Sequence, residues 1–144
     1  MRASVLIPVK NGGALLGDVL PAVQAQRTPW PFEVIVVDSG STDGSVELVR
    51  ARGVRCETIA PEAFGHGRTR NQLAALSTGE FLVFITQDAR PASPEWLAHL
   101  VEACDAEPDV AGAFGPHRAH PDARTITQRE LAQHFAGFGA EQSV

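Results

Sequence analysis

The chain has 144 residues, of which 44% are hydrophobic and 20% are charged, and its formal net charge is −5. This length suits one ordinary domain, and the composition excludes disordered, collagen-like and coiled-coil chains. The acidic balance argues against a nucleic-acid binder, because a phosphate backbone demands clustered positive charge, and no apolar run approaches the roughly 20 residues that span a bilayer.

The first part of the chain alternates apolar strand patterns with helical ones. Residues 3–9 form a nearly continuous apolar run, which is typical of a strand covered on both faces. A helix follows, interrupted by the missing backbone donor of Pro21. Its predicted buried face carries apolar residues at i, i+3, i+4 and i+7, namely Leu16, Val19, Leu20 and Val23. Residues 32–38 are rich in β-branched side chains and predict the second strand, and a short helix is expected over 44–52.

The same alternation continues through the middle of the chain. A third strand is expected over 54–59, and a loop over 61–67 leads into a helix that runs through Leu76. Residues 81–86 are apolar almost without interruption and predict a fourth, buried strand.

A strong helix signal opens the last third of the chain. Residues 93–95 supply a capping serine, a proline at the first helical position and an acid that faces the helix dipole. This helix is expected to end before Pro108, and a fifth strand is expected over 110–114. Beyond Gly115 we expect an irregular loop, a weak helix and a frayed end, over 116–122, 125–138 and 139–144 respectively.

Regular alternation of strands and helices predicts an α/β, Rossmann-like fold, in which right-handed βαβ units form a mainly parallel sheet flanked by helices. Ligand sites in such sheets lie outside the carboxyl ends of the strands. Polar loops follow three of the predicted strands at that edge, over residues 10–13, 38–43 and 87–90. These loops are therefore the places to look for a binding site.

The loop after the second strand is the first candidate. Asp38 ends an apolar strand and is followed by Ser-Gly-Ser-Thr-Asp-Gly, so its carboxylate can accept hydrogen bonds from a nucleobase or a ribose. The alternative is turn chemistry, because tight loops need the same residue types. The place of Asp38 at the carboxyl end of a strand favours binding. Thr42 or Asp43 is placed to cap the next helix, and capping explains Asp43 at least as well as binding does.

The second candidate is the segment Phe-Gly-His-Gly-Arg-Thr-Arg-Asn over residues 64–71. Arg68 and Arg70 stand at a helix entrance, where guanidinium donors and the helix N-terminus can clamp a diphosphate. The alternative is a surface loop whose arginines pair with nearby carboxylates, and composition alone does not decide between the two.

Asp88 is the third candidate, because it follows the fourth strand within Thr-Gln-Asp. A single carboxylate there can ligate a divalent cation, which often takes one or two carboxylates plus phosphate oxygens. The alternative is a turn aspartate before Pro91. His117 and His120, with Asp122 nearby, form a further conceivable metal site, although histidines in a proline-flanked loop are more often simply solvated.

Four linked segments together resemble the family 2 glycosyltransferases, which have the GT-A nucleotide-sugar-binding fold. The resemblance covers residues 3–115. It is carried by residues 4–11 (SVLIPVKN), 36–44 (VVDSGSTDG), 68–71 (RTRN) and 79–88 (GEFLVFITQD). Within the family, residues 64–67 (FGHG) joined to 86–88 (TQD) look most like the rhamnosyltransferase branch. The resemblance implies a nucleotide-sugar-binding core over residues 1–115 and the start of an incomplete acceptor region over 116–144.

The resemblance also assigns roles to individual residues. Pro8 and Val9 would line the base pocket, and Asp38 would hold the base or the ribose. Asn11 and Ser41 are counted with them as donor-binding residues.

On the diphosphate side, the resemblance implies that Arg68 or Arg70 lies near the base and diphosphate. Asp88 matches the last acid of the family's Asp-x-Asp motif, which binds the ribose and the metal that bridges the diphosphate. Thr86 stands where the first Asp of that motif normally stands. The family's general base lies further downstream, and no residue here matches it, since Glu130 is better explained as a charge on a helix surface.

The implied reaction moves a sugar, rhamnose if the branch is right, from a nucleoside diphosphate to an acceptor hydroxyl with inversion, in the synthesis of cell-surface polysaccharide or glycoconjugate. A divalent cation, Mg²⁺ or Mn²⁺, and arginine would offset the charge on the leaving diphosphate. The expected partners are therefore a nucleotide sugar and a saccharide or lipid-linked acceptor, without nucleic acid and without a transmembrane segment.

Two other functions stay open at this point. One is a non-catalytic nucleotide-sugar-binding module, or a truncated fragment of the enzyme, and the other is a receiver-like signalling domain with Asp38 or Asp88 as phosphoacceptor. The receiver ranks low, because no lysine follows the last strand. The N-terminus lacks the pattern of a signal peptide, and Cys56 and Cys104 suit reduced thiols, so the expected location is the cytoplasm, with peripheral membrane association left open.

Overall fold

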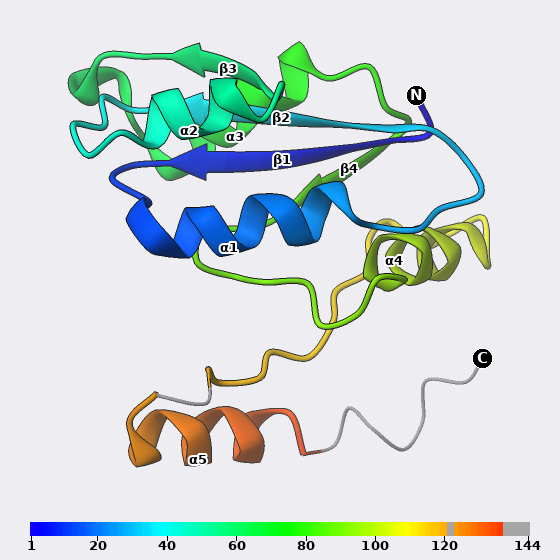
Figure 1. The fold of residues 1–144 in the computed structure, drawn as a ribbon. Coiled ribbons are helices and arrows are strands. Elements are labelled where there is room, and N and C mark those ends of the chain that lie inside the picture. Colours follow the sequence, from blue (N-terminus) through cyan, green and yellow to red (C-terminus); the bar gives the residue numbers. More distant parts are fainter. Residues whose placement is uncertain (121–122, 137–144) are drawn as a thin grey trace.

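A computed structural model describes residues 1–120 and 123–136, and a parallel sheet forms its centre (Figure 1). The four strands have the spatial order β3-β2-β1-β4. They are β1 (Ala3–Val9), β2 (Phe32–Asp38), β3 (Arg55–Thr58) and β4 (Phe81–Phe84). The α/β fold with a parallel sheet flanked by helices is confirmed.

The central strand β1 sets the register of the sheet. It pairs with β2 from Ala3 opposite Phe32 to Val9 opposite Asp38, and with β4 from Ala3 opposite Phe81. Because all pairings are parallel, the carboxyl ends of the strands meet at one edge, on the left in Figure 1. This carboxyl edge carries the loops that the sequence singles out.

Five α-helices and one short 3₁₀ turn connect and flank the strands in the described part of the chain. The helices are α1 (Gly13–Gln24), α2 (Ser45–Ala51), α3 (His66–Leu76), α4 (Trp96–Asp105) and α5 (Thr125–His134), and the 3₁₀ turn η1 spans Pro61–Ala63. Helix α1 continues through Pro21. All four residues of its predicted apolar face are buried, namely Leu16, Val19, Leu20 and Val23.

Both faces of β1 are covered, as its continuous apolar pattern predicts. Alternate side chains point to opposite faces of a strand. Ala3, Val5, Ile7 and Val9 therefore join a core with α1, α2 and α4, while Leu6 joins a second core with Leu73 of α3. The sheet is thus a middle layer, and burial of its apolar side chains is the main source of stability.

Strand β4 is less buried than its apolar sequence predicts. Val83 is buried in the first core, but Leu82 and Phe84 are 42% and 41% exposed on the opposite face. The strand lies at the edge of the described sheet, where α3 does not cover it. The expectation of a fully buried fourth strand is therefore wrong.

The predicted fifth strand over 110–114 is also wrong, because these residues have no regular structure. Only Val110 and Phe114 are large and apolar in this run, and both are exposed. The Ala-Gly-Ala between them has little side-chain surface to pack on a sheet, which weakens any strand preference.

Helix α4 begins at Trp96, just after the helix signal at residues 93–95. These residues form a turn in which the Trp96 N–H donates to the Ser93 carbonyl at 3.3 Å.

Helix α5 has no buried residue, and Figure 1 shows it away from the sheet. It ends at His134, earlier than the expected 138. The frayed end expected over 139–144 lies outside the described residues. Within the described ranges, every helix falls short of the length and apolar character that crossing a bilayer requires.

At the opposite, amino edge of the sheet, Glu33 ties three segments together. One oxygen of Glu33 accepts hydrogen bonds of 2.7 Å from the Ser4 hydroxyl and from both the backbone N–H and the hydroxyl of Thr78. The Gly79 N–H in turn donates to the Ser4 hydroxyl at 2.9 Å. Partial burial by itself raises the pKa of Glu33, but the bonds from Ser4 and Thr78 outweigh it and hold the pKa below its usual value.

Replacing Glu33 by glutamine tests this cluster. The pKa of Glu33 is lowered on folding, so its contribution to stability is present above the ordinary glutamate pKa of about 4.3 and is lost as the pH falls through the folded-state pKa. We expect E33Q to lose about 1–2 kcal/mol of unfolding free energy at pH 7 and to approach the wild type below about pH 4. Urea denaturation at the two pH values measures this, and an equal gap at both would contradict it.

Candidate functional site

The loops after β1 and β2 are joined by reciprocal hydrogen bonds at the carboxyl edge. The Asn11 N–H donates to the Ser41 hydroxyl at 2.7 Å, and the Thr42 N–H donates to the Asn11 side-chain oxygen at 2.9 Å. Asn11 has a φ of 48°, a conformation that asparagine tolerates better than most residues. Asn11 and Ser41, both predicted as donor-binding residues, therefore lie together and shape one another's loops.

Asp38 is only 1% exposed, and its carboxylate organises its own loop. One oxygen accepts the backbone N–H groups of Gly40 and Ser41 at 2.9 and 2.8 Å, and the other accepts the Ser41 hydroxyl. These hydrogen bonds are the turn chemistry that forms the alternative to binding. A carboxylate has about four acceptor positions, so one remains.

Asp43 acts on two elements at the same edge. Its carboxylate accepts the N–H of Ser45 at 3.1 Å, in the first turn of α2, and the N–H of Gly13 at 2.9 Å, at the start of α1. The Ser45 hydroxyl lowers the pKa of Asp43 most, and the backbone N–H groups of Ser45 and Gly13 add to this against the effect of burial. The N-cap position of α2 is Gly44 and not Thr42 or Asp43, but the Asp43 carboxylate accepts N–H groups at the starts of both helices.

Lys10 connects the first loop to both of its neighbours. Its ammonium donates to the carbonyl oxygens of Ser39 and Gly40 at 2.9 and 2.6 Å. Its backbone N–H donates to the Gln87 side-chain oxygen at 2.8 Å, and the Gln87 amide donates back to the Lys10 carbonyl at 3.0 Å. The loops after β1, β2 and β4 are therefore held together through one residue.

The turn η1, which precedes the arginine segment, packs against the second loop at Gly40. Gly40 has a φ of +84°, and a Cβ there would lie 2.9 Å from the ring of Pro61, so the second loop packs closely on η1. Arg68 then reaches back to the Ala63 carbonyl at 3.4 Å, and Arg70 bonds the His66 carbonyl at 3.1 Å.

Neither of these two arginines forms an ion pair within the described residues. The described part of the chain therefore does not show the alternative arrangement, in which surface carboxylates pair with these arginines. Arg68 is exposed and Arg70 is half-buried, so their guanidinium groups keep donors for an anion.

Asp88 is exposed, and no hydrogen bond or ion pair engages its carboxylate within the described ranges. In residues 1–120 and 123–136, no three His, Cys, Asp or Glu side chains gather into a metal cluster. A cation at this edge would therefore take one protein carboxylate and complete its oxygen shell from phosphate and water, as Mg²⁺ commonly does. The donor set fits a metal that arrives with a diphosphate.

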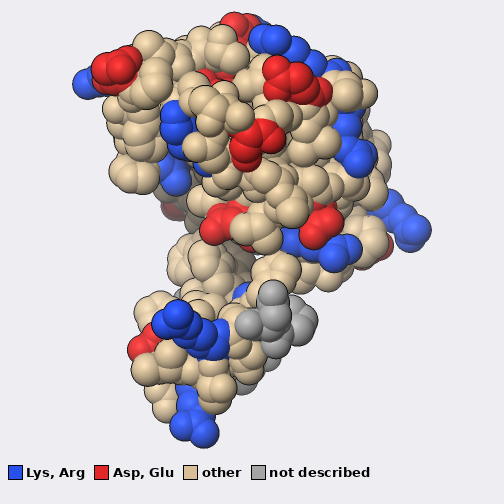
Figure 2. All heavy atoms as spheres, turned by 60° about the vertical axis from the view of Figure 1, so that its left-hand side comes forward, with Lys and Arg blue, Asp and Glu red and all other residues tan. Residues whose placement is uncertain are grey.

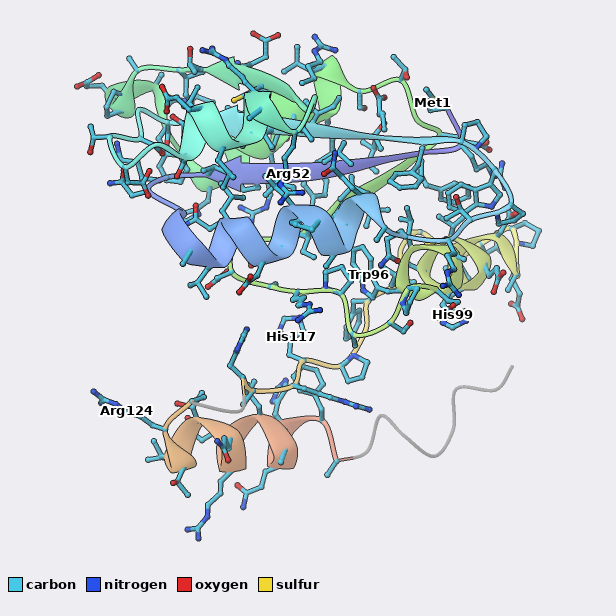
Figure 3. All side chains as sticks on the ribbon, viewed as in Figure 1. Met1, Arg52, Trp96, His99, His117 and Arg124 are labelled. Carbon is cyan, nitrogen blue, oxygen red and sulfur yellow. The ribbon has the colours of Figure 1, made fainter. Side chains whose placement is uncertain are left out.

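The remaining candidates lie elsewhere. His117 packs against Phe135 with ring centroids 5.4 Å apart, and Asp122 lies outside the described residues. Figure 3 shows His117 below α1, and Arg124 extends to the left from the start of α5. Figure 2, which turns the left side of Figure 1 forward, shows acidic and basic side chains interspersed over the body of the molecule.

Pro8 is half-buried and Val9 is 3% exposed, so Val9 contributes mainly backbone. The Val9 carbonyl already accepts both the N–H and the hydroxyl of Ser39, at 2.9 and 3.1 Å. Sequence reasoning missed the roles of Lys10 and Gln87. The available signal was their place, since each stands at the carboxyl end of a predicted strand with a side chain long enough to reach the neighbouring loop.

Comparison with known proteins finds both similar sequences and similar structures. The model of the family described as "Glycosyl transferase family 2" matches residues 4–142. The O-antigen chain rhamnosyltransferase RfbN of Salmonella typhimurium is 34% identical over 128 residues, which are 88% of this chain and 40% of that protein. The O-antigen chain rhamnosyltransferase WbaN of Salmonella anatum is 31% identical over 125 residues, 85% of this chain and 39% of that protein. This chain thus spans about 40% of the length of these relatives.

Solved structures with the same fold include two nucleotide-sugar complexes. TarS 1–349 of S. aureus, in complex with UDP-GlcNAc, has a TM-score of 0.64 and 26% identity over 74% of this chain and 32% of that chain. The mannosyltransferase PcManGT of Pyrobaculum calidifontis, in complex with GDP-Man and Mn²⁺, has a TM-score of 0.60 and 28% identity over 74% of this chain and 33% of that chain. The expected likeness to rhamnosyltransferases and the GT-A fold are both confirmed.

Proposed function

Because this chain belongs to glycosyl transferase family 2, we propose that it binds the nucleoside-diphosphate sugar of an inverting glycosyltransferase at the carboxyl edge of its sheet. One observation carries the proposal: three loops are held together there, beside an unpartnered Asp88 carboxylate and two arginines that form no ion pair in the described chain. Acceptors for a nucleoside and donors for a diphosphate thus come from the same edge.

The nucleoside half of the proposed site lies between the loops after β1 and β2. Pro8 and the Val9 backbone line the base pocket, and Asn11 and Ser41 keep the two loops in register around it. Asp38 holds the second loop and has one acceptor position left for a base N–H or a ribose hydroxyl. The burial of Asp38 favours a role in keeping its loop rigid over a role in direct contact with the donor.

The diphosphate half involves Asp88 and the entrance of α3. We assign Asp88 to the ribose and to a divalent cation, and Arg68 or Arg70 to the diphosphate. The cation, when bound, offsets charge that develops on the leaving diphosphate. Mn²⁺ in the PcManGT complex supports a divalent cation for the family, and thermal denaturation with each metal distinguishes Mg²⁺ from Mn²⁺.

We propose rhamnose as the transferred sugar and a saccharide or lipid-linked acceptor in the synthesis of cell-surface polysaccharide. Two O-antigen rhamnosyltransferases among the relatives support this assignment. Residues 1–115 would then form the donor-binding core, and residues 116–144 would begin the acceptor region. The receiver-like signalling alternative does not agree with the family assignment.

A donor-binding module that does not itself transfer the sugar is the second candidate. One observation favours it: Glu130 is the acid that the described residues beyond 115 offer as a general base, and it is exposed on α5, away from the sheet. Binding of the donor without turnover, with any acceptor supplied, would select this candidate.

We place the protein in the cytoplasm. Cys56 and Cys104 are both free thiols, which suits a reducing compartment. Peripheral association with a membrane would bring the site to a lipid-linked acceptor, and cell fractionation tests both statements.

Thermal denaturation with a panel of ligands tests donor binding. The chain is heated with UDP, GDP or dTDP, each with and without Mg²⁺ or Mn²⁺. We expect at least one nucleotide to raise the midpoint in a metal-dependent way, by a few degrees at saturating ligand, because binding to the folded state alone stabilises it. No shift with any of the three nucleotides and either metal would contradict the proposed function.

A further inference from the structure

The side chain of Gln87 forms a two-way clamp on the backbone of Lys10. Its oxygen accepts the Lys10 N–H at 2.8 Å, and its amide donates to the Lys10 carbonyl at 3.0 Å. A side-chain amide is suited to this task because it offers an acceptor and a donor side by side. Glutamate would lose the donor, and methionine would lose both.

The clamp lies just beyond the point where the pairing of β4 with β1 ends. That pairing stops at Leu6 opposite Phe84, and one more backbone bond follows, from the Ile85 N–H to the Leu6 carbonyl at 3.2 Å. Beyond this point, the hydrogen bonds that tie residues 86–90 to the first loop in the described chain are the two of Gln87. The Thr86–Ala89 turn is otherwise closed on itself, by the Ala89 N–H donating to the Thr86 carbonyl at 3.1 Å.

The clamp is the hydrogen-bonded link to a neighbouring loop that lies next to Asp88 in the described chain. Asp88 follows Gln87 directly and makes no hydrogen bond or ion pair of its own in the described part of the chain. Lys10 is itself bound to the Asp38 loop, because its ammonium donates to the carbonyl oxygens of Ser39 and Gly40. Gln87 therefore links the loop that carries Asp88 to the loop that carries Asp38.

We propose that Gln87 is a positioning residue of the donor site, which orders the Asp88 segment against the first and second loops before the nucleotide and metal arrive. This inference rests on the proposed function, since it assigns a role within the same site. Loops that are already ordered lose less conformational entropy on binding, so the clamp contributes to donor affinity without touching the donor.

The test compares Gln87→Met with Gln26→Met. Gln26 is a matched control because it also clamps backbone: its amide donates to the carbonyls of Ala22 and Ser93 at 3.1 and 2.9 Å, and its oxygen accepts the Leu97 N–H at 2.9 Å. Its three bonds join α1 to the start of α4 and not the loops of the site. Both variants keep the length of the side chain.

Calorimetric titration of dTDP, UDP and GDP, each with Mn²⁺ and without metal, supplies the affinity. We expect Q87M to weaken Mn²⁺-dependent nucleotide binding by about 10- to 100-fold, as is typical when a residue that supports a metal ligand is lost. Q26M should bind like the wild type at a temperature where both variants are folded. Hydrogen exchange of the Lys10 amide, measured without ligand, should accelerate in Q87M and not in Q26M.

Each outcome has a distinct meaning. Unchanged nucleotide affinity in Q87M, or an equal loss in Q26M at matched stability, overturns the role of Gln87 while leaving the proposed function in place. A wild-type chain that binds none of the three nucleotides overturns the proposed function and the inference with it. Accelerated exchange at Lys10 together with the Q87M-specific loss of affinity supports the inference.

Discussion

Asp88→Asn is expected to abolish the metal-dependent gain in nucleotide affinity, a loss of about 100-fold, while leaving the stability of the fold unchanged. The carboxylate is exposed and has no partner in the described chain, so its charge does nothing for folding that the neutral amide cannot replace. A hard divalent cation needs that charge, because the protein offers it no cluster of acids within the described residues. Calorimetry with and without Mn²⁺ measures the effect.

Asp109→Asn is the matched control for this prediction. Asp109 is also an exposed aspartate, and it lies in the loop after α4. It should keep the full metal-dependent gain, and both variants should unfold within about 0.5 kcal/mol of the wild type. If D88N retained the gain, Asp88 would not be the metal-binding carboxylate. If D88N unfolded, the expectation that this carboxylate does nothing for folding would be wrong.

Gly79→Ala should have the largest effect on stability, about 3 kcal/mol or more of unfolding free energy. A Cβ at Gly79 would lie 2.5 Å from two backbone atoms of the central strand, the carbonyl carbon of Ala3 and the nitrogen of Ser4. Backbone in the middle of a sheet cannot move aside as a side chain can. Relief by moving residues 78–80 would break the bonds to Glu33 and Ser4.

Gly17→Ala provides the opposite expectation in the same fold. Nothing lies within 4 Å of a Cβ at Gly17, which is inside α1. Alanine should therefore stabilise the protein by about 0.5–1 kcal/mol through its better helix propensity.

Thermal denaturation measures both variants. For Gly79→Ala, the thermal midpoint should fall by roughly 6–12 °C. A G79A midpoint close to the wild type would show that β1 can yield at this point.

The strands and helices that carry dense apolar patterns were predictable from the sequence. The bounds expected for β1 and β2 agree with the structure, because continuous β-branched and apolar runs stop at polar turn residues. The strand expected over 110–114 failed where the pattern was thin, with small residues between two large ones. The exposure of Phe84 was not predictable, since it depends on which elements lie beside β4 in space.

At the site, the place of the loops was predictable and their internal bonding was not. Strand direction alone brings Asn11, Asp38 and Asp88 to one edge of the sheet. The sequence does not reveal that the Asp38 carboxylate is buried by its own loop, because the same residues serve both a turn and a ligand. The link from Gln87 to Lys10 joins residues 77 positions apart, and it requires the register of β4 against β1.

Amide chemical-shift mapping of the wild-type chain, titrated with the nucleotide that stabilises it best and Mg²⁺, tests the central claim most directly. We expect the perturbed amides to cluster at the carboxyl edge of the sheet, in the loops that follow β1, β2 and β4 and at the entrance of α3. The amides of the amino edge around Glu33 and Thr78 should stay unchanged. Saturable binding that perturbs the amino edge or α5 instead, with the carboxyl-edge loops unchanged, would contradict the account.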